Sequence, residues 1–260
     1  DYPFLRHEFL LALEQCGCTT AESGWLPQHV VVENAGGSLV AAMPLYMKTH
    51  SMGEYVFDWS WADAYQRHGL DYYPKLVTAI PFTPCAGPRL VVAPTVDVAA
   101  MTALVQQAVL AQAEVLRVSG WHVLFPEQEL HERLQAGGML LRGGCQYQWF
   151  NRGYHDFDEY LATFASRKRK TLRKERSVVA DAGVQLSVLE GGDVSEAQWS
   201  QFYQFYASTY RVRGRRPYLN AAFFRQLAHT MPQQLMLVLA RSEEHTSELP
   251  VTWPYLVCRL

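Results

Sequence analysis

Apolar and polar residues follow one another along the first 150 residues in the way that a mixed α/β structure requires. Apolar residues recur at helical spacing in 5–15 and 97–116, which we expect to form helices. Two apolar runs, 28–33 and 38–47, flank the turn sequence NAGG and predict a β-hairpin. The remaining pattern predicts strands at 55–59, 121–125 and 139–150, and helices at 63–80 and 127–135.

The second half begins near residue 151 and alternates helices with single strands. Asp156 and Glu159 are a predicted capping pair for helical residues that continue to Ala182. Two further helix starts are expected at Ser195, paired with Gln198, and at Asn220, with strands at 184–189 and 235–239. A strand without neighbours leaves its backbone groups unpaired, so we expect the second domain to lack the rest of its sheet.

Several uncommon short motifs occur in a fixed order along the chain. They are PLYMKTHS at 44–51, GEYVFDW at 53–59, YYPKL at 72–76, PFTP at 81–84 and GPRL at 87–90. This series resembles a bacterial family of FemAB-like, GNAT-like acyltransferases related to peptidoglycan biosynthesis, over residues 1–240. The later stretch resembles the Fem-type aminoacyltransferases through Tyr160-Leu161, SRKRKTLRK at 166–174, Ala182-Gly183-Val184, Thr209-Tyr210-Arg211, Tyr218 and Phe223-Phe224.

The resemblance implies a fold and a reaction. The fold is mixed α/β with tandem GNAT-like (acyl-CoA N-acyltransferase) domains at 1–150 and 151–240, the second truncated. The reaction transfers an acyl or aminoacyl group from acyl-CoA or aminoacyl-tRNA to an amine on a small molecule or cell-wall precursor. Fem-type enzymes carry a helical arm that has no counterpart in this sequence, which leaves transfer-RNA use open. Because the family's donor cleft lies mostly beyond residue 240, we expect this chain to be an inactive fragment.

Residues 241–260 are expected to be foreign to the protein. Residues 241–249 read RSEEHTSEL, the translation of a common sequencing-library adapter, and 256–260 fit a later part of it. We therefore expect the native sequence to end near Ala240 and the rest to be an adapter-derived tail. The alternative is a native polar loop followed by a short strand. The chain starts at Asp1 rather than Met, so we expect clipping at both ends.

Composition narrows the class of protein. A hydrophobic content of 49% and a charged content of 18% are ordinary for a chain with a substantial core. The apolar run 39–47 contains Pro44 and is far short of the ~20 residues of a spanning helix, so no transmembrane segment is expected. The four cysteines before the tail form no CxxC pair, which favours reduced thiols and a cytoplasmic location. His122 and His131 have no acidic cluster beside them, so no metal site is expected.

Positive charge is concentrated in two short segments. Residues 166–176 hold seven basic residues and one acid, although the whole chain has a net charge of −2. Because Arg and Lys bind phosphate, this concentration suggests an anionic ligand. The candidate phosphate ligands are Lys168, Arg169, Lys170, Arg173, Lys174, Arg211 and Arg213. The alternatives are a solvated helix face and an exposed linker, and a rival function is a non-catalytic module that binds nucleic acid or another polyanion through 166–176.

Aromatic and acidic residues are mixed densely in residues 54–75. Such a mixture is typical of a binding cleft, where rings pack a substrate and polar groups orient it. The candidate substrate contacts are Tyr55, Trp59, Trp61, Tyr65, Tyr73 and Lys75. Asp58 and Asp63 are the candidate general bases, with a pKa raised by the neighbouring rings. The alternatives are aromatic packing, a capping role for Asp63 and an outward-pointing Lys75. The sequence contains no GxSxG, HExxH or Walker motif and no acetyl-CoA loop of the form RxxGxG/A.

Overall fold

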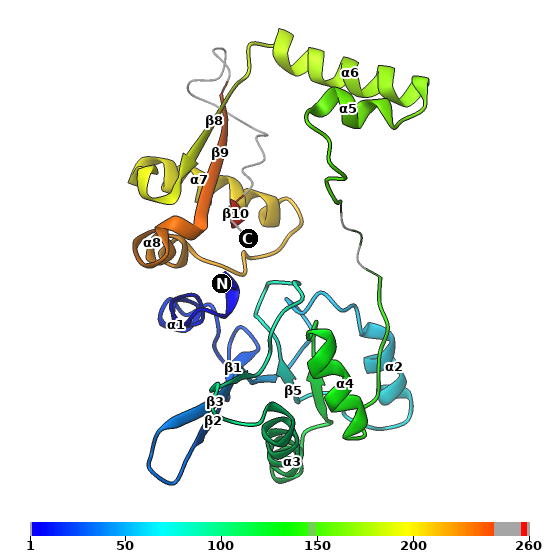
Figure 1. The fold of residues 1–260 in the computed structure, drawn as a ribbon, viewed down its shortest axis with the longest axis vertical. Helices are drawn as coiled ribbons and strands as arrows, with labels where there is room; N and C mark the ends of the chain where they lie inside the picture. Colours follow the sequence, from blue (N-terminus) through cyan, green and yellow to red (C-terminus); the bar gives the residue numbers. More distant parts are fainter. Residues whose placement is uncertain (1, 146, 148, 242–255, 259–260) are drawn as a thin grey trace. The chain divides into compact units, whose positions relative to one another are not determined.

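The chain folds as a mixed α/β protein with three small sheets (Figure 1). The structure, a computed structural model, describes residues 2–145, 147, 149–241 and 256–258. Two compact units divide it. The first unit comprises Asp1–Gly143 and Pro217–Thr230, and the second comprises Gly144–Arg216 and Met231–Arg259. Most of the predicted tail lies outside the described residues, so its foreign origin and the predicted domain limits stay predictions.

Two sheets form the first unit. The larger has the order β1-β4-β5-β7 and consists of β1 (Trp25–Pro27), β4 (Tyr46–Lys48), β5 (Lys75–Thr78) and β7 (Trp121–Val123). Only β5 and β7 run parallel in it. The smaller has the order β2-β3-β6 and consists of β2 (Val30–Glu33), β3 (Leu39–Met43) and β6 (Val91–Val92). The pairing of β2 with β3 confirms the predicted hairpin.

The helices of the first unit are α1 (His7–Gln15), α2 (Trp59–Arg67), α3 (Val98–Val115), α4 (Gln128–Ala136) and α8 (Ala221–Thr230), with the 3₁₀ turn η1 (Pro3–Leu5) before them. Asp97 caps α3 by accepting a hydrogen bond from the Ala100 amide. Although α8 comes late in the sequence, it packs in this unit. Phe223 meets Phe9 of α1 edge to face, with ring centroids 5.6 Å apart, and Asn220 Nδ2 donates to the Cys16 carbonyl.

The larger sheet has two faces with different contents. Side chains alternate along each strand, so Leu76 and Trp121 share one face, where they pack with Val105 and Val109 of α3 in the main core. The opposite face carries Lys48 and the residues in register with it. The main core thus fills one side of the sheet, while the other side combines a second apolar cluster, which includes Trp25, Tyr46 and Val77, with buried lysines.

Helix α3 is long and apolar enough, by length and composition, to cross a membrane. One of its faces contributes Met101, Val105 and Val109 to the main core, while Leu104 and Val115 are exposed. Helix α3 is therefore a stronger candidate for a membrane-spanning segment than residues 39–47, the run from which we expected no transmembrane segment. It is nonetheless weak evidence, since the core helix of a folded domain passes the same test.

Three predictions of secondary structure in the first unit are wrong. Residues 55–59 form no strand, because Tyr55 and Phe57 have left-handed φ angles of 60° and 51°. The predicted helix 63–80 is instead α2 followed by the buried strand β5. Helix α2 ends just before Gly69, whose φ of 69° turns the chain away from the helix. A glycine adopts this conformation without strain. No strand occurs among the described residues of 139–150.

The second unit contains α5 (Phe157–Ala162), α6 (Ser166–Asp181), α7 (Glu196–Arg211), β8 (Gln185–Glu190), β9 (Leu235–Arg241) and β10 (Leu256–Cys258), with the 3₁₀ turns η2 (Gly191–Asp193) and η3 (Pro232–Gln234). Its sheet is antiparallel with the order β10-β9-β8. The caps predicted at Asp156 and Ser195 are confirmed: Asp156 accepts from the Glu159 amide, and Ser195 and Gln198 form a complete capping box. The single helix predicted to continue to Ala182 is wrong, because the backbone is extended at Ala165 (ψ of 147°) and separates α5 from α6.

Candidate functional site

A loop closes over the second face of the larger sheet and binds charged residues there. Strand register places Trp25, Lys48 and Lys75 in one row across β1, β4 and β5. We call residues 51–58 the covering loop. The Met52 carbonyl accepts hydrogen bonds from Lys48 Nζ and from Trp25 Nε1, each at 3.2 Å. The start of the loop is therefore tied to two strands.

Lys75 holds the rest of the covering loop. Its Nζ donates to Glu54 Oε2 at 2.9 Å and to Asp58 Oδ2 at 2.6 Å, and all three side chains are fully buried. The same ammonium lies 3.0 Å from Ser51 Oγ. Tyr72 also donates to Asp58 Oδ2, at 2.6 Å. Buried charges persist only when paired and hydrogen-bonded, so Lys75 anchors the loop, and the alternative of an outward-pointing Lys75 is wrong.

Burial separates the proton affinities of these groups. Burial would raise the pKa of Asp58, but hydrogen bonds from Lys75, Tyr72 and Ser51 outweigh it and lower the pKa to about 2. Burial raises the pKa of Glu54 against the attraction of Lys75. Burial, helped by Lys75, lowers the pKa of Lys48 to about 7. The pKa of Asp58 is therefore lowered, not raised as the sequence predicted, and its Oδ2 is already occupied by Lys75 and Tyr72.

Aromatic residues of the covering loop and of the start of α2 face solvent. We call Tyr55, Phe57, Trp59 and Trp61 the aromatic surface; their exposed fractions are 39%, 73%, 50% and 50%. The other three predicted substrate contacts lie inward: Tyr65 and Tyr73 pack edge to face against buried Tyr72, at 5.1 and 5.0 Å, and Lys75 is fully buried. The predicted substrate residues thus separate into an exposed group and a group in the buried network.

The two candidate carboxylates lie in different surroundings. Asp58 occupies the N-cap position of α2 and is buried, whereas Asp63 lies one turn further along α2 and is exposed. The capping position that we considered for Asp63 is therefore filled by Asp58. Residues four apart on a helix are neighbours, so Asp63 lies beside exposed Trp59.

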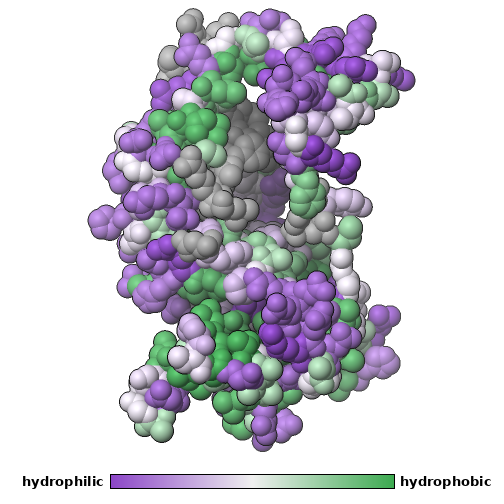
Figure 2. All heavy atoms as spheres, in the orientation of Figure 1, coloured by the Kyte–Doolittle hydropathy of each residue, from purple (hydrophilic) through white to green (hydrophobic). Residues whose placement is uncertain are grey.

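The predicted phosphate ligands lie on two elements of the second unit. Lys168, Arg169, Lys170, Arg173 and Lys174 are on α6, and no residue of α6 is buried. Arg173 pairs with Asp158 at 3.1 Å, in an exposed contact. Arg211 is the last residue of α7. Arg213 lies in the turn after this helix and donates a hydrogen bond back to the carbonyl of Thr209 in α7. The surface over α5 and α6 is mostly hydrophilic (Figure 2). No hydrogen bond or ion pair among the described residues joins the two groups of cations.

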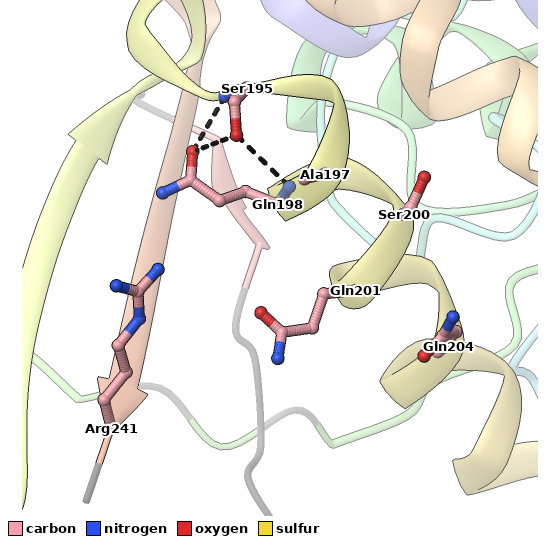
Figure 3. A pocket seen from close by; sticks show the side chains of 7 residues that line it. All are labelled: Ser195, Ala197, Gln198, Ser200, Gln201, Gln204 and Arg241. Atoms are coloured by element: carbon pink, nitrogen blue, oxygen red, sulfur yellow. Dashed lines mark hydrogen bonds between the residues drawn. The ribbon is translucent and has the colours of Figure 1, made fainter. Parts of the chain in front are cut away.

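A polar groove of about 600 Å³ lies beside the start of α7 (Figure 3). Its lining residues are Ser195, Ala197, Gln198, Ser200, Gln201, Gln204 and Arg241. Gln198 turns back toward Ser195 and completes the capping box. The sequence did not predict this groove. Among the described residues, no group of three or more His, Cys, Asp or Glu side chains could hold a metal ion.

Sequence reasoning missed several members of the buried network, among them Lys48, Ser51 and Tyr72. The burial of Lys48 could have been predicted from the sequence, because it lies two residues after Tyr46 in an apolar strand and so shares the face of this buried ring. Its position beside Lys75 depends on the antiparallel register of β4 with β5, which pairs residues that are distant in sequence.

Comparison with known proteins assigns the chain to a family. The model of the FemAB-like family, described as peptidoglycan biosynthesis/recognition, matches residues 1–250. The matched range includes the covering loop, the aromatic surface and α6. No curated protein matches the chain. Because the family match extends over nearly the whole sequence, as the motifs in 44–90 predicted, this chain belongs to the FemAB-like family of peptidoglycan-related transferases.

Proposed function

We propose that this chain is part of a tandem GNAT-like N-acyltransferase that transfers an acyl or aminoacyl group to an amine of a cell-wall precursor. The family match over residues 1–250 is the observation that carries this proposal. The site adds a physical argument, because a rigidly held loop presents aromatic side chains to solvent. Enzymes of this reaction class need positioning above all, since the amine attacks the donor directly.

In this proposal the aromatic surface binds the acceptor. Exposed rings pack against the apolar faces of sugars and peptides while losing little conformational entropy. The buried ion pairs of Lys75 hold the backbone beneath these rings. Asp58 then acts by positioning the loop, and Asp63 is the carboxylate that an acceptor on Trp59 can reach.

Cations of the second unit bind the donor in this proposal. Acyl-CoA and aminoacyl-tRNA both present phosphate groups, and Arg and Lys side chains bind phosphate well. Arg167, Lys170 and Lys174 follow one another at helical spacing on α6 and are exposed, so they form a continuous positive stripe.

Acceptor binding can be tested without turnover. A soluble peptidoglycan fragment with a free amine is titrated into the full chain by calorimetry, and the N-acetylated fragment serves as the control ligand. The paired substitution Trp59→Ala/Trp61→Ala should weaken binding of the amine-bearing fragment about tenfold or more, since aromatic contacts contribute ~1 kcal/mol each. Trp149→Ala, which removes an exposed tryptophan of the second unit, should have no effect. Equal affinity in all three proteins would refute the acceptor assignment.

A second candidate function is polyanion binding by α6, and the exposed stripe of cations favours it. Double-stranded RNA is the probe, with affinity measured at several salt concentrations. Lys170→Glu/Lys174→Glu should lower affinity and flatten the salt dependence by roughly one unit of slope for each phosphate that is no longer neutralised. Arg152→Glu, an exposed change of the same sign outside α6, serves as the control. If the salt dependence of affinity were unchanged in the α6 variant, this role would be excluded. Weak RNA binding together with tight coenzyme A binding would favour the transferase.

A further inference from the structure

His122 lies at the edge of the larger sheet and has no role in the contacts described above. Its strand, β7, is the last in the order β1-β4-β5-β7. Register places Tyr46, Val77 and His122 in one row on the face that the covering loop closes. Lys48 and Lys75 form the adjacent row. His122 is half-buried, so its ring lies between the covered face and solvent.

The imidazole of His122 is oriented by an aromatic contact. Its ring meets the ring of Tyr72 edge to face, with centroids 5.9 Å apart and an interplanar angle of 86°. Tyr72 is itself fixed by its hydrogen bond to Asp58. Within the described residues, the two ring nitrogens of His122 make no hydrogen bond. A half-buried imidazole with this freedom can bind an atom of a ligand.

Burial, together with the positive charges near it, keeps His122 neutral. Burial lowers its pKa to about 4, and the positive charges of Lys75 and Arg142 act in the same direction against the attraction of Asp58. A neutral imidazole has one nitrogen that can accept a proton. Because two of the causes are nearby cations, an anion bound among them would raise the pKa of His122 toward its ordinary value.

Arg142 is the cation that an exterior ligand can reach. It is exposed, and its Nη2 donates to the Val56 carbonyl at 2.9 Å and to the Phe57 carbonyl at 3.5 Å. These contacts use one of the two terminal nitrogens, so the guanidinium retains donors for a carboxylate or phosphate. They also place Arg142 against the backbone of the covering loop, next to the aromatic surface.

We propose that His122 is the proton acceptor of the acceptor site and that Arg142, held on the covering loop, binds an anionic group of the same ligand. The inference rests on the proposed function, which supplies the reaction. The acceptor nitrogen forms a bond to the acyl carbon, and the bond from that carbon to the donor's sulfur or oxygen breaks. The leaving atom keeps the electron pair, and the proton released from nitrogen moves to His122. The ligand class is therefore an amine that also carries a carboxylate or phosphate.

Titration of the imidazole tests this inference without any turnover. The C2 proton of His122 is assigned by NMR through its loss in His122→Gln and followed against pH in the full chain. Three probes are compared at equal concentration: glycine, which has an amine and a carboxylate, acetate, which has only the carboxylate, and ethylamine, which has only the amine. Glycine and acetate should raise the pKa of His122 by about one unit at saturation, the size of shift expected from one new nearby anion. Ethylamine should not.

Matched variants locate the effect. Arg142→Gln should abolish the shift caused by glycine and acetate, whereas Arg67→Gln, an exposed arginine at the end of α2, should retain it. A His122 that titrates near its ordinary pKa without ligand, or that responds equally to all three probes, would overturn the inference. Its failure is separable from that of the proposed function. Loss of fragment binding in Trp59→Ala/Trp61→Ala tests the acceptor surface, while the imidazole titration tests His122 alone.

Discussion

Replacing Lys48 by methionine should make the protein's stability less dependent on pH. Lys48 is fully buried, and its ammonium has one hydrogen-bond acceptor, the Met52 carbonyl, and one ring contact, 3.7 Å from the centroid of Trp25. Lys75, by contrast, binds two carboxylates and a hydroxyl. Lys48 is thus the less well compensated of the two buried lysines, and its charged form is the unfavourable one in the folded state.

The sign and size of the effect follow from the pKa of Lys48. Its pKa is about 7 in the folded protein and 10.5 without the fold. Between these values the unfolded chain binds more protons, so the free energy of unfolding should rise with pH, by up to ~1.4 kcal/mol per pH unit. Lys48→Met removes this slope. At pH 7 it also relieves the desolvation of the ammonium, worth a few kcal/mol, and removes the hydrogen bond and the ring interaction, worth ~1 kcal/mol each.

Urea unfolding of the full chain between pH 6.5 and 9.5, followed by circular dichroism, measures both quantities. Lys48→Met should be as stable as the parent at pH 7 or more stable, and the parent should approach it as pH rises. Lys168→Met, which removes an exposed lysine from α6, should leave the slope of the parent unchanged. A slope that persists in Lys48→Met, or a variant destabilised by more than ~2 kcal/mol at pH 7, would refute the reasoning.

Three further predictions concern the network and its support. Lys75→Met should lower the free energy of unfolding by ~3–5 kcal/mol in urea titrations, because Glu54 and Asp58 remain buried without their cation; a decrease below about 1 kcal/mol would contradict the anchoring role. Phe223→Ala should cost about 3 kcal/mol or more in the same assay, as it removes buried packing between α8 and α1, whereas exposed Val212→Ala should be neutral. Acidification from pH 6.5 to 4 should destabilise the protein in part through His122, whose pKa is lower when folded, and this part of the destabilisation should be absent in His122→Gln.

Elements with local signals could be predicted from the sequence. The Ser195–Gln198 capping box marks the start of α7, and the NAGG turn marks the hairpin of β2 and β3. The start of the helical stretch at Asp156 and its end before Gly183 were also predicted, although the structure divides that stretch into α5 and α6. In each case residues a few positions apart determine the conformation.

Elements without local signals were missed for a physical reason. The apolar residues of 63–80 fit a helix, but strand β5 within that range is fixed by its neighbours β4 and β7, which bury it on both sides. The left-handed conformations of Tyr55 and Phe57 are unfavourable for such side chains and depend on the surrounding contacts that hold the loop. Tertiary packing determines the conformation of both segments, and local sequence propensity carries no information about that packing.

The dense mixture of acids and aromatics in 54–75 therefore has two separate causes. Glu54 and Asp58 both pair with buried Lys75, and their charges also attract Lys48 on the same covered face of the sheet. Trp59 and Trp61 are not needed for that packing, since half of each side chain is exposed. In the proposed function these exposed rings bind the acceptor, and the buried ion pairs hold the backbone that carries them. The outward rings and His122 thus serve the proposed function, whereas the inward acids stabilise the fold by compensating the buried lysines.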